Sequence, residues 1–176
     1  MLFRSNGVTT TSAKQVKLGG RYDHDLSERW YGYGGLDFEK NVPANVRLRT
    51  LPQVGLGYHI VKSDPFSFNV FGGYAYNHQI NYTPPDSIGS EAMLGEETLH
   101  KFTPATSFHQ KLVIFPSLTE SGEYRVQFDA GLVTNIVRAW NLTLTVSDRY
   151  DHRPSPGVKQ NDYVVFAGIQ YAFGPR

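Results

Sequence analysis

Apolar and polar residues alternate with a period of two along most of the chain, which predicts β-strands with two different faces. The clearest case is residues 66–82, where Phe68 and Val70 point one way and Asn69 the other. Nine such segments follow one another, so we predict an all-β, antiparallel, up-and-down transmembrane β-barrel of about nine strands in a single domain, residues 1–176. The expected strands are 8–24, 29–39, 47–61, 66–82, 88–102, 107–118, 123–137, 142–147 and 162–173.

The segment 88–102 has the weakest alternation, because Glu91, Glu96, Glu97 and His100 obscure the period and would also suit a helix. A turn at residues 103–106, with a proline at its second position, favours a strand on each side of it. We therefore predict a strand here too.

The last strand indicates the environment of the barrel. Tyr163, Val165, Ile169 and Tyr171 belong to one apolar row with an aromatic residue near each end. A strand that crosses a membrane needs roughly 9–11 residues, an apolar outward face and aromatics at the interfaces. This row therefore predicts contact with lipid.

The connections alternate between tight turns and looser or longer loops, as in outer-membrane barrels with short periplasmic turns and longer extracellular loops. Aromatic residues gather at both ends of the strands and predict two girdles; Trp30 and Trp140 belong to the short-turn end. The expected short turns are 25–28, 62–65, 103–106 and 138–141, and the expected looser links lie near 40–45, 83–87, 119–122 and 152–161.

Charged residues lie on the face opposite the apolar rows, where they avoid the roughly 2–4 kcal/mol that an arginine or lysine costs on the lipid face at the midplane. An aqueous channel and a packed, hydrogen-bonded interior both fit such a row. Phe71, Val113 and Phe115 share it, which favours a narrow or filled interior. The predicted interior polar row is Lys17, Arg21, Asp37, Glu39, Arg47, Arg49, Lys111, Arg125, Asp129 and Arg149.

Composition narrows the function classes. Seventeen basic and sixteen acidic residues give a formal charge of +1, so we expect no nucleic-acid partner. Without cysteine there are no disulfides or thiolate metal sites, and we expect neither metal nor cofactor. The first residues lack the features of a secretory signal, and bacterial barrels have even strand numbers, so we expect further strands before residue 1.

Two patterns suggest chemistry, but a structural role explains each of them more simply. The tetrapeptide Arg-Tyr-Asp-His occurs at 21–24 and 149–152, at opposite ends of the barrel, as polar strand ends do. Ser107 and His109 share a strand face but lack the context of a nucleophilic serine. We therefore expect a protein that is not an enzyme.

Several segments resemble a family of outer-membrane β-barrel proteins of unknown function that are described as salt-induced. They are 18–23 (LGGRYD), 53–58 (QVGLGY), 74–76 (YAY) and above all 148–162 (DRYDHRPSPGVKQND). The resemblance covers nearly the whole chain. It implies a Gram-negative outer-membrane location, further N-terminal strands and a role in salt or osmotic stress.

The end of the chain resembles the C-terminal signal of outer-membrane barrels, with Gly168, Tyr171 and Phe173 in the matching positions. It departs from that signal at Phe166, where a polar residue is usual, and in the three residues that follow Phe173. The resemblance implies the barrel-assembly machinery and outer-membrane lipid as partners.

We therefore expect an outer-membrane barrel that serves envelope integrity under osmotic stress or small-solute permeation. One alternative is a lipid-modifying barrel enzyme, which requires activity that depends on Ser107 or His109. Another is a soluble lipocalin-like binding barrel, which would place apolar residues inside and charges outside.

Overall fold

The computed structural model describes residues 2–5, 8–11, 15–137, 140–154 and 157–171, and within these ranges it contains strands and no helix. None of the described segments is therefore a helix that could cross a membrane. The strands are β1 (Leu2–Ser5), β2 (Val8–Thr11), β3 (Gln15–Asp25), β4 (Trp30–Asn41), β5 (Val46–Lys62), β6 (Phe66–Asn81), β7 (Ser87–Thr103), β8 (Thr106–Pro116), β9 (Tyr124–Val137), β10 (Trp140–Asp151) and β11 (Asn161–Tyr171).

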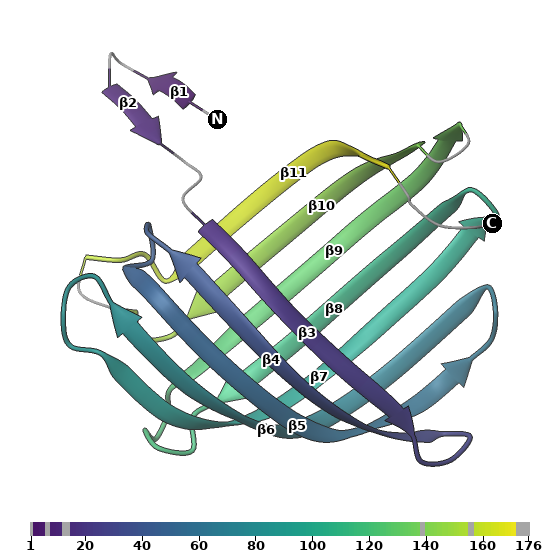
Figure 1. Ribbon diagram of the computed structural model, residues 1–176, viewed down its shortest axis with the longest axis horizontal. Coiled ribbons are helices and arrows are strands. Elements are labelled where there is room, and N and C mark those ends of the chain that lie inside the picture. Colours follow the sequence, from purple (N-terminus) through teal and green to yellow (C-terminus); the bar gives the residue numbers. More distant parts are fainter. Residues whose placement is uncertain (1, 6–7, 12–14, 138–139, 155–156, 172–176) are drawn as a thin grey trace.

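Strands β3 to β11 form one nine-stranded sheet in which each strand pairs antiparallel with the next along the chain. The prediction of nine antiparallel up-and-down strands is confirmed. The sheet curls strongly, so that one face becomes an interior (Figure 1). Within the described residues, β3 and β11 are its edges, and β1 and β2 pair only with each other.

The predicted strand bounds differ from the structure by more than two residues in two places. Residues 8–24 were expected to form one strand, but β2 ends at Thr11 and β3 begins at Gln15. The two strands belong to different sheets, β2 pairing with β1 and β3 with β4, and residues 12–14 between them lie outside the described part of the chain. Strand β10 is longer than the predicted 142–147, because its ladder with β9 continues to Asp151.

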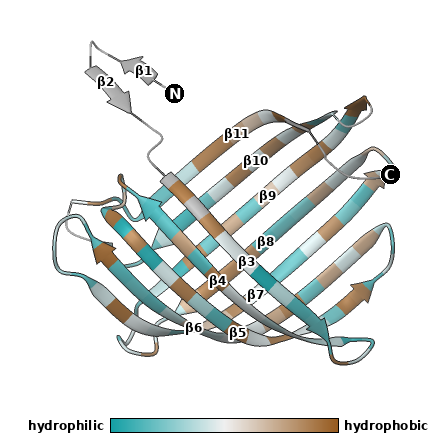
Figure 2. Cartoon of the chain, in the orientation of Figure 1, coloured by the Kyte–Doolittle hydropathy of each residue, from teal (hydrophilic) through white to brown (hydrophobic). Residues whose placement is uncertain are grey.

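The two faces of the sheet have opposite character, and brown and teal bands alternate along its strands (Figure 2). The outward face exposes large apolar residues, among them Leu18 at 72%, Val165 at 61% and Ile169 at 68%. The inward face holds a buried cluster: Tyr31, Tyr33, Leu51, Phe71, Ala75, Met93, Val113 and Phe115.

The two ends of the sheet also differ. We call the end with the connections 26–29, 63–65 and 104–105 the short-turn end, and the end with 42–45, 82–86, 117–123 and 152–160 the long-loop end. At the long-loop end Asn45 joins two connections: its Nδ2 donates to Thr83 O at 3.1 Å and its Oδ1 accepts from Thr83 N at 3.0 Å. Asn45 adopts a φ of 61°, a conformation that asparagine tolerates better than most residues.

Candidate functional site

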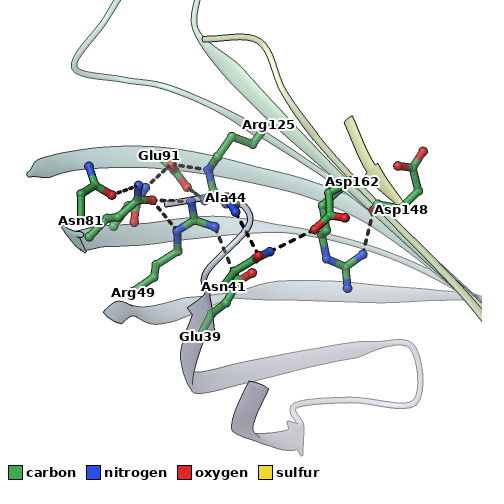
Figure 3. A network of polar contacts seen from close by, with 12 residues as sticks. Glu39, Asn41, Ala44, Arg49, Asn81, Glu91, Arg125, Asp148 and Asp162 are labelled. Atoms are coloured by element: carbon green, nitrogen blue, oxygen red, sulfur yellow. Dashed lines mark hydrogen bonds and ion pairs between the residues drawn. The ribbon is translucent and has the colours of Figure 1, made fainter. Parts of the chain in front are cut away.

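The inward face carries an ion-paired network near the long-loop end (Figure 3). Arg49 Nη1 donates to Glu39 Oε2 at 3.0 Å, and Arg49 Nε donates to Gln79 Oε1 at 2.8 Å. Arg125 makes a two-point contact with Glu91, including Nε to Oε1 at 3.0 Å. Glu39, Glu91 and Arg125 are each less than a tenth exposed. Because each charge has an opposite partner, the network is compatible with burial.

A second pair lies on β9 and β10. Arg149 Nη2 donates to both carboxylate oxygens of Asp129, at 2.7 and 2.8 Å, and Ser147 Oγ donates to Asp129 Oδ1 at 2.6 Å. Near the opening between the sheet edges, Asn41 Nδ2 donates to Asp162 Oδ2 at 3.1 Å, which connects β4 with β11. The curled sheet is therefore bridged by side chains at its long-loop end.

In the half toward the short-turn end, Arg21 reaches from β3 across the interior toward β7. Its Nη1 lies 3.7 Å from Glu97 Oε2, and its guanidinium carbon lies 4.3 Å from the ring centre of Tyr33 and 5.0 Å from that of Phe71. Lys111 Nζ approaches Glu97 Oε1 at 3.8 Å. The side chain of Arg21, 17% exposed, thus narrows the interior by ionic and cation–π contacts.

Glycines on the inward face make room for the aromatic rings below Arg21. A Cβ at Gly57 would overlap the ring of Tyr31, and one at Gly95 would overlap the ring of Phe71. The two rings therefore extend over glycines of the neighbouring strands, where any larger residue would displace them.

Three cavities extend from the middle of the interior to the long-loop end. The first, of about 260 Å³, is bounded by Asp37, Lys111 and Phe115, among others. A smaller one, of about 60 Å³, shares Arg49 with it. The third, of about 320 Å³, shares Arg125 with the small one and lies at the long-loop end. The interior is thus hollow toward the long loops, while Arg21 and the rings of Tyr31, Tyr33 and Phe71 occupy part of it toward the short turns.

The structure places most of the predicted interior polar row on the inward face: Arg21, Asp37, Glu39, Arg49, Lys111, Arg125, Asp129 and Arg149. The side chain of Lys17 lies outside the described part of the chain. Arg47 departs from the row. The β5–β6 ladder is irregular between Val46 and Leu48, so Val46 takes the buried position and Arg47 is exposed.

Sequence reasoning missed several inward residues. Glu91 and Glu97 were not assigned to the interior because polar Glu96, Thr98 and His100 on the outward face of the same strand hide the alternation. Extending the period of two from β6 through its register with β7 would have placed them. The buried amides of β6 were not singled out as candidates: Asn77, Gln79 and Asn81.

The other candidates do not lie together in the part of the chain that the structure describes. Ser107 and His109 lie on the inward row of β8, and no hydrogen bond joins them in the described structure. The first Arg-Tyr-Asp-His repeat lies in β3, and the second runs from the end of β10 into the connection that follows, at the opposite end of the sheet. No group of three potential metal ligands occurs among the described residues.

Of the predicted assembly signal, Gly168 and Tyr171 fall in β11, with the side chain of Tyr171 outside the description. Phe173 lies outside the described residues.

Between the strands at the short-turn end, Lys101 Nζ donates to Asp64 Oδ1 at 2.8 Å. This hydrogen bond and the attraction of the ammonium lower the pKa of the Asp64 carboxyl. Both groups are largely exposed, so the pair adds little to stability.

Comparisons with known proteins agree with this fold. No curated protein matches the chain. A solved structure described as a NanC porin in a rhombohedral crystal form has 12% sequence identity and a TM-score of 0.58, over 90% of this chain and 79% of that one. This likeness shows a shared fold. The sequence profile of a family described as "Protein of unknown function, DUF481" matches residues 2–173. The chain therefore belongs to the DUF481 family.

Proposed function

We propose that this protein is a Gram-negative outer-membrane β-barrel whose interior provides a narrow polar route for small solutes. The observation that carries the proposal is the division between the faces: exposed apolar residues such as Leu18 and Ile169 point outward, while Glu39, Glu91 and Arg125 are buried inside. A soluble lipocalin-like barrel requires the reverse arrangement. Lipid around the sheet and the barrel-assembly machinery during folding are the partners that this proposal implies.

Aromatic residues at the strand ends support the membrane assignment. At the short-turn end, Trp30 and Tyr58 project from the outward face and pack edge to face with ring centres 5.0 Å apart. Amphipathic rings favour the boundary between acyl chains and water. The porin-like fold and the family-wide match add support, because both are compatible with a membrane barrel.

The interior supports passage of small solutes only. Its cavities open toward the long-loop end, and the cross-interior contact of Arg21 with Glu97, over Phe71, narrows the way toward the short turns. A solute would have to pass beside this guanidinium. We therefore expect a small conductance with a strong size limit.

Planar-bilayer recording of the full chain tests this proposal. We expect small, discrete conductance steps, and a severalfold larger step for Arg21→Ala because the side chain that spans the interior is removed. Arg47→Ala, which removes an exposed arginine at a bulge, is the matched control and should leave the conductance unchanged. If the unaltered protein folds into bilayers and stays electrically silent, permeation is excluded.

We further infer a role in salt or osmotic stress from the sequence resemblance described above. A strain that lacks the protein should then grow more slowly than its parent at high salt, and recover when the gene is restored. Equal growth of both strains would contradict this role.

A further inference from the structure

The cavity in the middle of the interior, of about 260 Å³, is lined by charges of both signs. The described residues of its wall include three carboxylates and three cations, which are Asp37, Glu39, Asp129, Arg49, Lys111 and Arg149. These formal charges cancel, so the wall as a whole favours neither an anion nor a cation. The volume lies a little below the roughly 300–1,000 Å³ typical of ligand pockets, which limits a ligand to a small molecule.

Four of these six groups compensate one another within the protein. Arg49 Nη1 donates to Glu39 Oε2 at 3.0 Å. Arg149 Nη2 donates to both carboxylate oxygens of Asp129, at 2.7 and 2.8 Å. A charged ligand would have to compete with a hydrogen-bonded partner at each of the four. Asp37 and Lys111 are therefore the groups through which this cavity can hold a charged ligand.

The carboxylate of Asp37 has a neutral partner. Its Oδ2 accepts from Gln53 Nε2 at 2.7 Å, and it forms no ion pair with a described residue. The residue is half-buried, so its carboxylate is open to the cavity. An amide donor leaves the negative charge uncompensated, and an ammonium group of a ligand would pair with it.

Lys111 presents the complementary charge. Its side chain is 35% exposed, and its Nζ lies 3.8 Å from Glu97 Oε1, beyond hydrogen-bond distance. Glu97 is shared with Arg21, whose Nη1 lies 3.7 Å from Glu97 Oε2. The ammonium also lies 5.3 Å from the ring centre of Phe71, a contact that uses none of its N–H donors. A carboxylate of a ligand could accept from these donors at a shorter distance than Glu97 does.

An apolar part of the wall completes the site. Its residues are each no more than 5% exposed, and they are Leu51, Phe71, Met93, Val113 and Phe115. A short aliphatic group would contact this part of the wall. A ligand with a single charge would satisfy only one of the two charged groups. We propose that the cavity binds a small zwitterion, an α-amino acid with a short aliphatic side chain, whose ammonium group pairs with Asp37 and whose carboxylate accepts from Lys111.

This inference deepens the proposed function, on which it rests for its biological meaning, by naming the class of solute. Binding is measured separately from permeation, by calorimetry with the full chain in detergent and L-alanine as the probe. We expect saturable binding of L-alanine. Propionate lacks the ammonium group and ethylamine lacks the carboxylate, so each should bind about tenfold more weakly than L-alanine.

Asp37→Asn and Lys111→Met each remove one charge from the cavity and should weaken L-alanine binding about tenfold. The matched controls are Asp64→Asn and Lys101→Met, which change an exposed pair outside this cavity and should leave the affinity unaltered. Slower gel migration on boiling reports whether each variant is folded. Should a variant fail to fold, the comparison of the three ligands on the unaltered protein decides the question.

The proposal is overturned if L-alanine shows no saturable binding, or if either folded cavity variant binds it as well as the unaltered protein. Propionate or ethylamine binding as tightly as L-alanine would also overturn it, because the cavity would then be a site for an anion or a cation. L-alanine binding by a protein that stays silent in bilayers would support this site while refuting permeation. Conductance without L-alanine binding would refute the site and leave permeation supported.

Discussion

Arg125 and Glu91 form an ion pair whose side chains are only 10% and 8% exposed. Arg125 reaches Glu91 by passing over the ring of Phe115, which lies on the intervening strand. Neither charge has ready access to bulk water, so each depends on the other. Removal of one partner of a buried pair leaves an uncompensated charge, which costs about 3–5 kcal/mol.

We therefore expect Arg125→Met to lower the free energy of unfolding by about 3 kcal/mol. The double variant Arg125→Met with Glu91→Met should lose less free energy of unfolding than the two single variants lose together. In the double variant no charge is left without a partner. Denaturant titration of the folded protein in lipid vesicles measures all three variants. Strictly additive losses would show that the two side chains do not interact.

The sequence was informative about residues wherever the alternation was regular. Arg49 and Arg125 were assigned to the interior from their positions in clean strands, and they are buried there. Arg47 was assigned to the interior but is exposed, because a bulge shifts the side-chain alternation. No residue type in that segment indicates the bulge. Which arginine pairs with which carboxylate depends on strand register, which single-strand periodicity does not contain.

At the scale of elements, the close fit of β4, β5 and β6 depends on inward glycines. Tyr33 and Phe71 pack edge to face with ring centres 5.8 Å apart, and Gly55 of the neighbouring strand provides the space beside Tyr33. A sheet with larger residues at these positions would have to displace its aromatic rings. The glycines thus determine how full the interior is.

Gly57→Ala is expected to destabilise the protein by about 1–3 kcal/mol, because its methyl group would overlap the ring of Tyr31. The matched control is Gly20→Ala on the outward face of β3, where a Cβ meets nothing within 4 Å. Comparison of their unfolding midpoints in denaturant measures the difference. Equal destabilisation by both substitutions would refute the packing argument.

Strand β7 shows why its own sequence was hard to interpret. Glu96 lies opposite Val70 and Leu112 on the outward face, and its Oε1 accepts from Gln110 Nε2 at 3.1 Å. Glu97, the next residue, lies inward between Arg21 and Lys111. A carboxylate on each face removes the alternation of apolar and polar residues from which a strand is recognised. The register with β6 shows which face each residue of β7 belongs to.

These adjacent glutamates give a direct test of which face meets lipid. We expect Glu96→Leu to raise the free energy of unfolding by about 1 kcal/mol, since it removes a carboxylate from the lipid face, where acidic residues cost less than basic ones. Glu97→Leu should lower the free energy of unfolding by about 1–2 kcal/mol, since Lys111 loses its carboxylate and Arg21 keeps only Asp23. Denaturant titration in lipid vesicles measures both changes. If both changes in the free energy of unfolding have the opposite sign, Glu96 faces inward and Glu97 faces lipid.

At the scale of the whole molecule, the two tryptophans report how the sheet sits in a bilayer. Trp30 is the first residue of β4 and Trp140 the first of β10, so both belong to the short-turn end although they are far apart along the chain. They are 50% and 47% exposed. The proposed orientation places both at the same membrane interface, where tryptophan is favoured.

In vesicles, the fluorescence of both tryptophans should be quenched more strongly by lipids brominated close to the headgroup than by lipids brominated near the chain ends. Trp30→Phe and Trp140→Phe, each of which leaves one tryptophan, should give the same depth dependence because both side chains lie at the short-turn end. Stronger quenching by the lipids brominated near the chain ends would show that the two tryptophans lie among the acyl chains and not at the interface. Quenching by aqueous iodide alone would show that the outward apolar face does not contact lipid. It would then contradict the membrane orientation on which the proposed function depends.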